Sequence, residues 1–262
     1  FTGLMNLAMG IFYGFGAYSY ALVSINLGWS FIPAVCLAVV INMILSLFIS
    51  LASVRFKNDI FILVSLAFQS IGYAILWNWT ELTGGPYGLS SIPRPDFFGL
   101  TIMKVPEFAI LGAVMLSLVI GLSYFIYRSP FGRTLQAIRD DEVAAKTLGK
   151  NTVWFKVRSV AISCGLTALA GALYASYITY IDATSFSVSE SIDIIFVLVL
   201  GGLVSIKGSI FGVIMFVVSQ EVFKFIGFDD SIAFNLRNII FAAAMLVLLY
   251  YRPKGIFGKL EL

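Results

Sequence analysis

Side chains able to carry out chemistry are few in this sequence, and the densest group of charged ones lies between positions 128 and 158. The chain has no histidine, which removes the most common general base and the most common zinc ligand. Cys36 and Cys164 fall inside long apolar runs and are expected to pack as small apolar side chains. Gly149 and Lys150 lack the upstream glycine and the following Ser or Thr of a phosphate-binding loop. We therefore expect no metal, no cofactor and no enzymatic activity, and any ATP hydrolysis would have to occur on another chain.

A second group of candidates consists of polar side chains inside or at the ends of apolar runs, namely Asn6, Gln69, Ser70 and Asp193. A polar group in hydrocarbon usually faces water, a ligand or a partner, so these residues are candidates for lining a substrate path. Alternatives to a path-lining role remain open. Asn6, Gln69 and Ser70 could form hydrogen bonds across neighbouring helices, and Asp193 could be a solvated acid at the membrane interface. No charge lies at the middle of an apolar run, which argues against a carrier driven by protons or sodium.

The elements that must position these residues are membrane-spanning helices. The chain is 60% hydrophobic and 12% charged, whereas a soluble domain carries about 25% charged residues. Eight apolar segments are apparent, and runs of this kind are typical of helices that cross about 30 Å of hydrocarbon. They cover residues 4–25, 31–53, 60–79, 108–127, 159–180, 191–203, 209–225 and 236–251. The prediction is an all-α, polytopic membrane protein whose residues 1–262 form a single transmembrane domain.

The distribution of basic residues predicts the orientation of this domain. If the side that holds residues 128–158 is cytoplasmic, then 13 of the 17 lysines and arginines lie on that side. The four on the other side are Arg94, Lys104, Lys224 and Arg237. Both ends of the chain are then cytoplasmic. The basic residues form no continuous patch of the kind that binds nucleic acid.

Two connecting segments are long. Residues 80–107, on the outer side, are rich in glycine and proline and are expected to form turns without a helix. Residues 128–158 begin with Pro130 and Gly132, continue with apolar residues at helical spacing, and reach a stop at Gly149. This pattern predicts one short amphipathic helix that is positioned to contact something in the cytoplasm. The alternative is a solvated interfacial segment without a partner.

Residues 129–149 resemble the cytoplasmic loop of branched-chain amino acid ABC-importer permeases of the LivM type. Within them, Glu142, Ala144, Ala145 and Gly149 are similar to the Glu-Ala-Ala…Gly pattern that binding-protein-dependent permeases present to their ATPase. Four further stretches resemble the same family and follow in the family's order. They are the glycine-rich residues 7–18, the Thr-Gly-Gly-Pro-Tyr-Gly-Leu run at 83–89, the glycine turn at 199–208 and the Tyr-Arg-Pro-Lys-Gly run starting at 251.

The resemblance implies a half-permease of a multi-pass importer in the bacterial inner membrane. Its implied partners are a second homologous permease, two cytoplasmic ATP-binding subunits, an outer solute-binding protein and membrane lipid. The helix within 128–158 would couple it to an ATPase, with Leu135, Ile138 and Val143 as apolar anchors, Arg133 and Arg139 giving orientation, and Gly149 the turn. Family members have additional N-terminal helices, and since the sequence begins with Phe1, one or more are expected to precede it.

One departure from the family bears on the solute. The third apolar segment reads Leu-Ala-Phe-Gln-Ser at 66–70, where the family often has Leu-Ala-Phe-Gly-Glu. The expected solute is a branched-chain or other amino acid, but a urea or short-amide permease fits a similar pattern. A self-contained secondary carrier or channel remains the alternative from another class.

Overall fold

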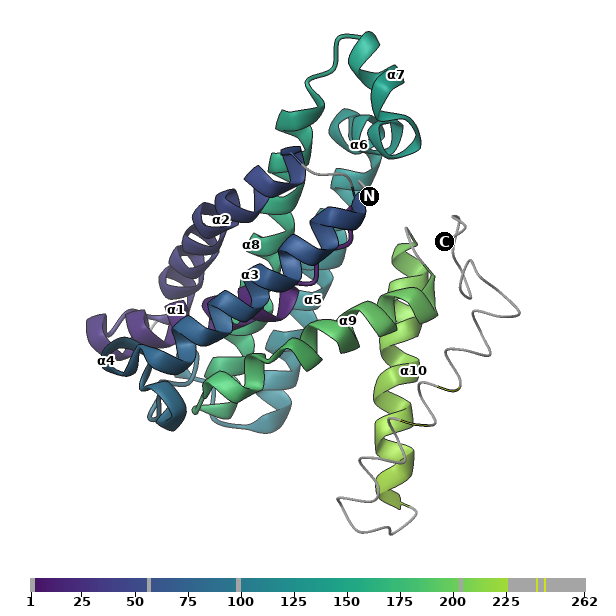
Figure 1. Ribbon diagram of the computed structural model, residues 1–262. Coiled ribbons are helices and arrows are strands. Elements are labelled where there is room, and N and C mark those ends of the chain that lie inside the picture. The colour runs from purple at the N-terminus through teal and green to yellow at the C-terminus, as the bar shows by residue number, and fades with distance from the viewer. Residues whose placement is uncertain are drawn as a thin grey trace. The chain divides into compact units, whose positions relative to one another are not determined.

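The computed structural model describes residues 3–55, 58–97, 100–202, 205–225, 239 and 243, and over these ranges the chain is mostly helical (Figure 1). The long helices are α1 (Met9–Leu27), α2 (Phe31–Arg55), α3 (Asn58–Asn78), α5 (Val105–Arg128), α8 (Thr152–Ile178), α9 (Val188–Gly201) and α10 (Ile206–Phe225). The short elements are α4 (Thr80–Thr83), η1 (Gly85–Tyr87), β1 (Asp96–Phe97), β2 (Leu100–Thr101), α6 (Pro130–Asp140), α7 (Glu142–Thr147) and η2 (Ala183–Phe186). The chain divides into two compact units, Phe1–Ser191 and Ile192–Leu262, and each is described by itself.

Four helices in the described ranges are long and apolar enough to cross a membrane: Phe31–Leu51 of α2, Ile60–Asn78 of α3, α5 and α8. The pair α9 and α10 would supply a fifth span if it counts as one helix bent by 119° at its break. The all-α class is therefore confirmed, whereas eight spans are not. The first expected span is the helix α1, which does not count among the four. The eighth, 236–251, lies outside the described residues except for positions 239 and 243.

Helices α1, α2 and α8 pack together and form the core of the first unit. The backbones of α1 and α8 approach closely where both helices carry small residues. A Cβ atom at Gly16 would lie 2.5 Å from the Cα atom of Ala168, and one at Gly171 would lie 2.0 Å from the carbonyl oxygen of Tyr13. Small residues at such contacts allow the dispersion and backbone contacts that hold helices together in lipid.

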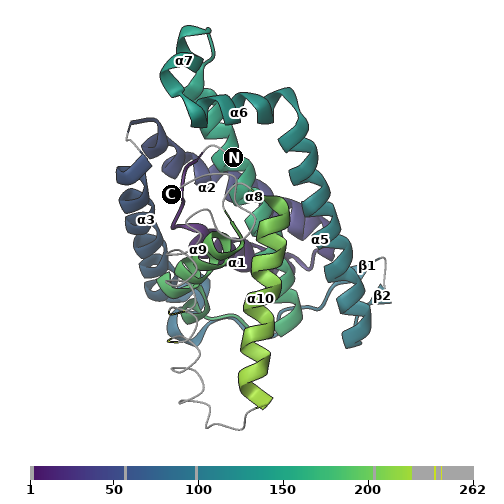
Figure 2. The same cartoon turned by 90° about the vertical axis from the view of Figure 1, so that its right-hand side faces the viewer.

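Helix α5 lies at the periphery of this unit and has no buried residue (Figure 2). It is held by Leu111 and Met115, which pack against the core, and by Phe108, whose ring centroid lies 4.7 Å from that of Tyr177. The helix begins at Val105, three residues before the expected start at 108, because Pro106 occupies the first turn where a missing N–H does no harm. Its outward face is almost wholly apolar, as expected of a helix that faces lipid or another membrane helix.

The segment between α3 and α5 is turn-dense, as the sequence indicates, but it contains the single helical turn α4 and the 3₁₀ turn η1, which were not expected. The segment is tied to the loop after α8 by a bridge between Leu89 and Ile181, with N···O distances of 2.8 and 3.0 Å. Gly88 adopts a φ of +65° there, and a Cβ atom at this position would lie 2.1 Å from the carbonyl oxygen of Ile181. The Gly-Gly-Pro run thus packs backbone against backbone.

In the second unit, α9 and α10 form the helical pair expected for 191–203 and 209–225. Glycines allow the two helices to meet near the break. A Cβ atom at Gly201 would lie 2.0 Å from the carbonyl oxygen of Gly208, and one at Gly212 would lie 2.4 Å from that of Val197. Through this contact α9 and α10 pack closely against each other on either side of the break.

Candidate functional site: the α6–α7 corner and a buried polar node

The 128–158 segment folds as two helices, α6 and α7, that meet at Asp141; the expectation of one helix was wrong. Asp141 has extended backbone angles (φ −155°, ψ 105°), and its carboxylate accepts hydrogen bonds from the N–H groups of Val143 and Ala144 at 2.8 and 3.0 Å. An Asp side chain that caps the following helix in this way interrupts the preceding one. We call α6, α7 and the connection to α8, residues 130–151, the coupling corner; it lies at one end of the first unit, and β1 and β2 lie toward the other end (Figure 2).

Helix α6 packs its apolar face inside the protein's own chain. Leu135 and Ile138 are buried, with Leu135 only 1% exposed. Phe131 stacks on Phe155 of α8 at a centroid distance of 5.4 Å, and Gly132 lies against the last carbonyls of α5. Leu135 and Ile138, which were expected to anchor on a partner, therefore point inward, because the end of α5 and the start of α8 already cover this face of α6.

Glu142 connects α7 to the first turns of α8. Its carboxylate accepts hydrogen bonds from Lys156 Nζ at 2.7 Å, Lys146 Nζ at 3.0 Å and Thr152 Oγ1 at 3.1 Å. Lys156 is almost fully enclosed, with a side chain 8% exposed. Burial alone would raise the pKa of Glu142, but the hydrogen bonds from Lys156 and Lys146 outweigh it and lower the pKa to about 2. The carboxylate is thus ionised and bound at neutral pH.

The outer surface of the coupling corner presents apolar side chains to the surroundings. Val143 is 71% and Leu148 78% exposed, and Ala144 lies exposed beside them. Gly149 ends α7 with a φ of +76°, a conformation that suits glycine, and no atom lies within 4 Å of where its Cβ would be. This patch of Val143, Ala144 and Leu148 is the corner's exposed contact surface, whereas Ala145 is buried beneath it.

The two arginines of the corner contact the protein itself. Arg133 donates from Nη1 to the carbonyl oxygen of Arg128 at 3.0 Å and remains exposed. Arg139 pairs with its neighbour Asp140 at 2.8 Å and is mostly covered. Only Arg133 therefore presents a guanidinium group to an approaching partner.

Polar side chains from elsewhere in the chain cap the amino end of α1. Ala8, at the cap position, has no side chain that could do so. Instead the N–H of Ile11 donates to Gln69 Oε1 at 2.7 Å, and the N–H of Gly10 donates to Ser191 Oγ at 2.8 Å. Just before the helix, the N–H of Leu7 donates to Ser65 Oγ at 2.9 Å. We call this cluster of Ser65, Gln69, Ser191 and Asn6 the polar node.

Gln69 is the centre of the polar node and is fully buried. Its Oε1 accepts from Ile11 and from Ser191 Oγ, the latter at 3.1 Å, and its Nε2 donates to the carbonyl oxygen of Phe186 at 2.9 Å. Its amide oxygen and its amide nitrogen are thus both bonded within the protein, so Gln69 bonds across helices.

The other expected path residues differ in their surroundings. Asn6 is also buried at the node, where Oδ1 accepts from the N–H of Ala8 and Nδ2 has no partner among the described residues. Ser70 is exposed and donates to the carbonyl oxygen of Leu66, so it lies outside the node. Asp193 is half-buried and belongs to the second unit.

Sequence reasoning missed three residues of these two sites. Lys156 and Thr152 lie within α8, which begins seven residues before the span expected to start at 159. Ser191 is a single hydroxyl residue in an apolar run, and it bonds to a residue 122 positions away. No local spacing pattern indicates such a contact.

The sequence profile for "Branched-chain amino acid transport system / permease component" matches residues 1–249, so the chain belongs to this family. It is 29% identical to the high-affinity branched-chain amino acid transport system permease protein LivM of Salmonella typhimurium and to that of Escherichia coli, over 97% of this chain and 64% of each relative. A probable LivM protein of Methanocaldococcus jannaschii is 27% identical over 87% of this chain and 68% of its own length. The autoinducer 2 import system permease protein LsrC of Salmonella typhi is 28% identical over 71% of this chain and 52% of its own.

The family suggested by residues 129–149 is thereby confirmed, and the chain is a membrane protein of a transport family. It spans 64% of the length of the first two relatives. No solved structure matches it.

Proposed function

We propose that the chain is the transmembrane permease subunit of an ATP-binding-cassette importer that moves branched-chain or other amino acids across the inner membrane. ATP would be hydrolysed on separate cytoplasmic subunits, and a solute-binding protein would deliver the amino acid from the outside. A second, homologous permease would complete the membrane part, and lipid would cover the rest. Membership of the permease family supports the ATP-binding subunits and the solute-binding protein.

The observation that carries the proposal is the connection of Glu142 to Lys156 and Thr152. The exposed surface of α7 is where an ATPase would bind, and the carboxylate of Glu142 makes α7 move with α8. Helix α8 packs against α1 through the close contacts at Gly16 and Gly171, and against α2 at Gly165. A displacement of α7 is thus passed to the core helices through rigid contacts, as a conformational switch in a transporter requires.

The topology of the proposed subunit has eight spans with both ends in the cytoplasm. The segments 4–25 and 236–251 and the pair α9 and α10 would join the four helices that are long enough to span. The excess of lysine and arginine on the side of the coupling corner supports this orientation. The placement of β1 and β2 toward the end of the first unit opposite the coupling corner fits it, since a turn-rich loop belongs in water.

The test is to change the exposed surface of the coupling corner and to measure ATPase binding and transport. The double substitution Val143→Glu and Leu148→Glu puts charge on the contact surface without touching a buried residue. We expect the ATPase subunits to be lost from the complex purified in mild detergent, and ATP-dependent uptake in proteoliposomes to fall at least about tenfold, since burying an unpaired charge at an interface costs several kcal/mol.

The matched control is Tyr87→Glu, which adds one negative charge of the same kind at an exposed position in the segment between α3 and α5. It should leave ATPase binding intact. Uptake that proceeds without ATP and without an ATPase would instead establish a self-contained carrier.

The residues at 66–70 favour one alternative for the solute. Gln69 and Ser70 stand where the family often has Gly-Glu, and the missing acid is compatible with urea or a short amide as the substrate. Competition of labelled leucine uptake by unlabelled valine, urea and acetamide distinguishes these, because only the true solute class displaces the label.

A further inference from the structure

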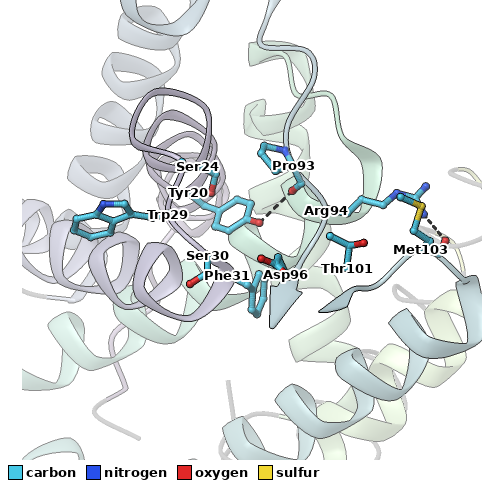
Figure 3. Close-up of a pocket in the computed structure, with 11 residues that line it drawn as sticks. Tyr20, Ser24, Trp29, Ser30, Phe31, Pro93, Arg94, Asp96, Thr101 and Met103 are labelled. Atoms are coloured by element: carbon cyan, nitrogen blue, oxygen red, sulfur yellow. Dashed lines mark hydrogen bonds between the residues drawn. The ribbon is translucent and has the colours of Figure 1, made fainter. Parts of the chain in front are cut away.

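A cavity of about 370 Å³ opens in the first unit at the carboxyl end of α1 (Figure 3). Its walls come from the end of α1, from the turn between α1 and α2, and from the segment between Pro93 and Met103 that contains β1 and β2. Its volume lies within the range of small-molecule sites, about 300–1,000 Å³. Nothing in the coupling corner or the polar node contributes to it.

One wall of the cavity offers acceptors for a cation. Asp96 has a carboxylate oxygen, Oδ1, that is buried and has no hydrogen-bond partner among the described residues. A buried carboxylate oxygen is normally bonded, and an ionised carboxylate can only accept, so the missing partner is a donor. The carboxyl end of α1, closed by Gly28 with a φ of 63°, also lines the cavity and adds the negative end of the helix dipole.

A second wall carries a guanidinium group. Arg94 also lines the cavity, and its Nη1 donates to the carbonyl oxygen of Met103, which holds the side chain in place (Figure 3). Among the described residues, neither Arg94 nor Asp96 forms an ion pair, although both line the same space. The two opposite charges therefore remain available to a third group, and a guanidinium group suits a carboxylate.

Part of the remaining surface is apolar, beside the hydroxyl groups of Ser24, Ser30 and Thr101. Trp29 and Met103 are exposed at the cavity, and Phe31 is buried behind it. The hydroxyl of Tyr20 donates to the carbonyl oxygen of Pro93 at 3.3 Å, which closes the floor (Figure 3). An acid, a guanidinium group and an apolar wall in one space complement a zwitterion with an apolar side chain.

We propose that this cavity binds an α-amino acid with an apolar side chain, with its ammonium group at Asp96, its carboxylate at Arg94 and its side chain against an apolar part of the wall. The proposal rests on the proposed function and adds to it a solute site on the permease itself. The site lies on the loop expected to face outward, so it would receive the amino acid before the switch of the core helices.

The test measures binding to the purified full chain in lipid nanodiscs without ATP, with L-leucine, L-leucinol and 4-methylpentanoate as probes. Leucinol keeps the ammonium group and lacks the carboxylate, and 4-methylpentanoate does the reverse. Leucine should bind at least about tenfold more tightly than either, because each charge-assisted bond contributes that much or more. Arg94→Gln should remove the preference for leucine over leucinol, and Asp96→Asn the preference over 4-methylpentanoate.

Glu107→Gln is the matched control, since Glu107 is an exposed acid of the same segment that pairs with Lys104 outside the cavity. It should change no affinity. Because each preference is a ratio within one variant, a partial loss of folded protein does not alter it. The proposed site would be refuted if the wild type and both variants showed the same affinity ratios of leucine to leucinol and of leucine to 4-methylpentanoate. It would also be refuted if leucinol bound the wild type as tightly as leucine. ATP-driven leucine uptake that persists in that case would leave the importer function intact, and leucine binding without ATP-driven uptake would retain the site and refute the importer.

Discussion

The carboxylate of Glu142 and the ammonium group of Lys156 lie 2.7 Å apart, although the two residues are 14 positions apart in the sequence with a glycine turn between them. Lys156 sits in the first turns of α8, where its charge is largely shielded from water. A covered lysine without a carboxylate would be costly, and the pair therefore holds α7 in one orientation relative to α8. The Glu of the Glu-Ala-Ala pattern, Glu142, thus forms its contacts with other residues of the same chain.

Breaking this pair should weaken the coupling corner. Lys156→Met or Glu142→Gln each removes a charge-assisted hydrogen bond and should lower the free energy of unfolding by about 1–3 kcal/mol. The double variant should lose less than the sum of the two, since neither charge is then left alone. Thermal unfolding of the purified chain, followed by tryptophan fluorescence, measures the cycle. Lys146→Met is the control because Lys146 is exposed, and it should cost about 0.5 kcal/mol.

The pH dependence of the coupling corner follows from the lowered pKa of Glu142. A carboxyl group whose pKa is lower in the folded state stabilises that state fully above its unfolded value, near 4.5, and progressively less as the pH falls toward about 2. Stability from this group should thus be constant from pH 5 to pH 8 and decrease below about 4.5. Glu142→Gln should flatten the acid part of the curve. A loss of the wild-type contribution already at pH 6 would contradict the assignment.

The contact between α1 and α8 should not tolerate a larger residue. Gly171→Ala places a methyl group 2.0 Å from the carbonyl oxygen of Tyr13 and should separate the two helices, with a loss of about 1–3 kcal/mol. Gly112→Ala and Gly121→Ala are matched controls in α5, where no atom lies within 4 Å of the new Cβ. They should be neutral or stabilising by about 0.5–1 kcal/mol. Size-exclusion profiles of heated samples would rank the three variants.

Gln69 and Ser70 are adjacent in sequence and should respond in opposite ways. Gln69→Leu leaves the N–H of Ile11 and the carbonyl of Phe186 buried without their partners, at a cost of about 1–3 kcal/mol each. Ser70→Ala removes an exposed hydroxyl and should change stability by less than about 0.5 kcal/mol. Chemical unfolding measures both. Reduced leucine uptake in a stable Ser70→Ala protein would instead assign Ser70 to the solute path.

Much of the fold could be predicted because apolar length is a local property. The expected segments 31–53 and 60–79 match α2 and α3 to within two residues at each end. The start of α8 was missed because Lys156 and Arg158 mark a loop by charge alone. In the structure Lys156 pairs with Glu142, and the guanidinium group of Arg158 lies over the ring of Trp154. The break at Asp141 was missed because the apolar spacing continues across it, and only the carboxylate's bonds to the next helix end the first one.

The sites were predicted less completely because their contacts are distant in sequence. The Glu-Ala-Ala pattern located the coupling corner, but which of its apolar residues face outward depends on α5 and α8. Leu135 and Val143 look alike as apolar positions, yet one is buried and the other exposed. The cavity gave no local signal, since Trp29 and Asp96 line the same space only after the chain has folded back.

The cap on α1 also bears on how the protein is made. The N–H of Gly10 bonds to Ser191, a residue 181 positions later, and that of Ile11 to Gln69, 58 positions later. When α1 first enters the membrane, neither partner has yet followed it there. The amino end of α1 therefore stays hydrated or chaperoned by the insertion machinery until most of the chain has followed, and its final seating is a late event in biogenesis.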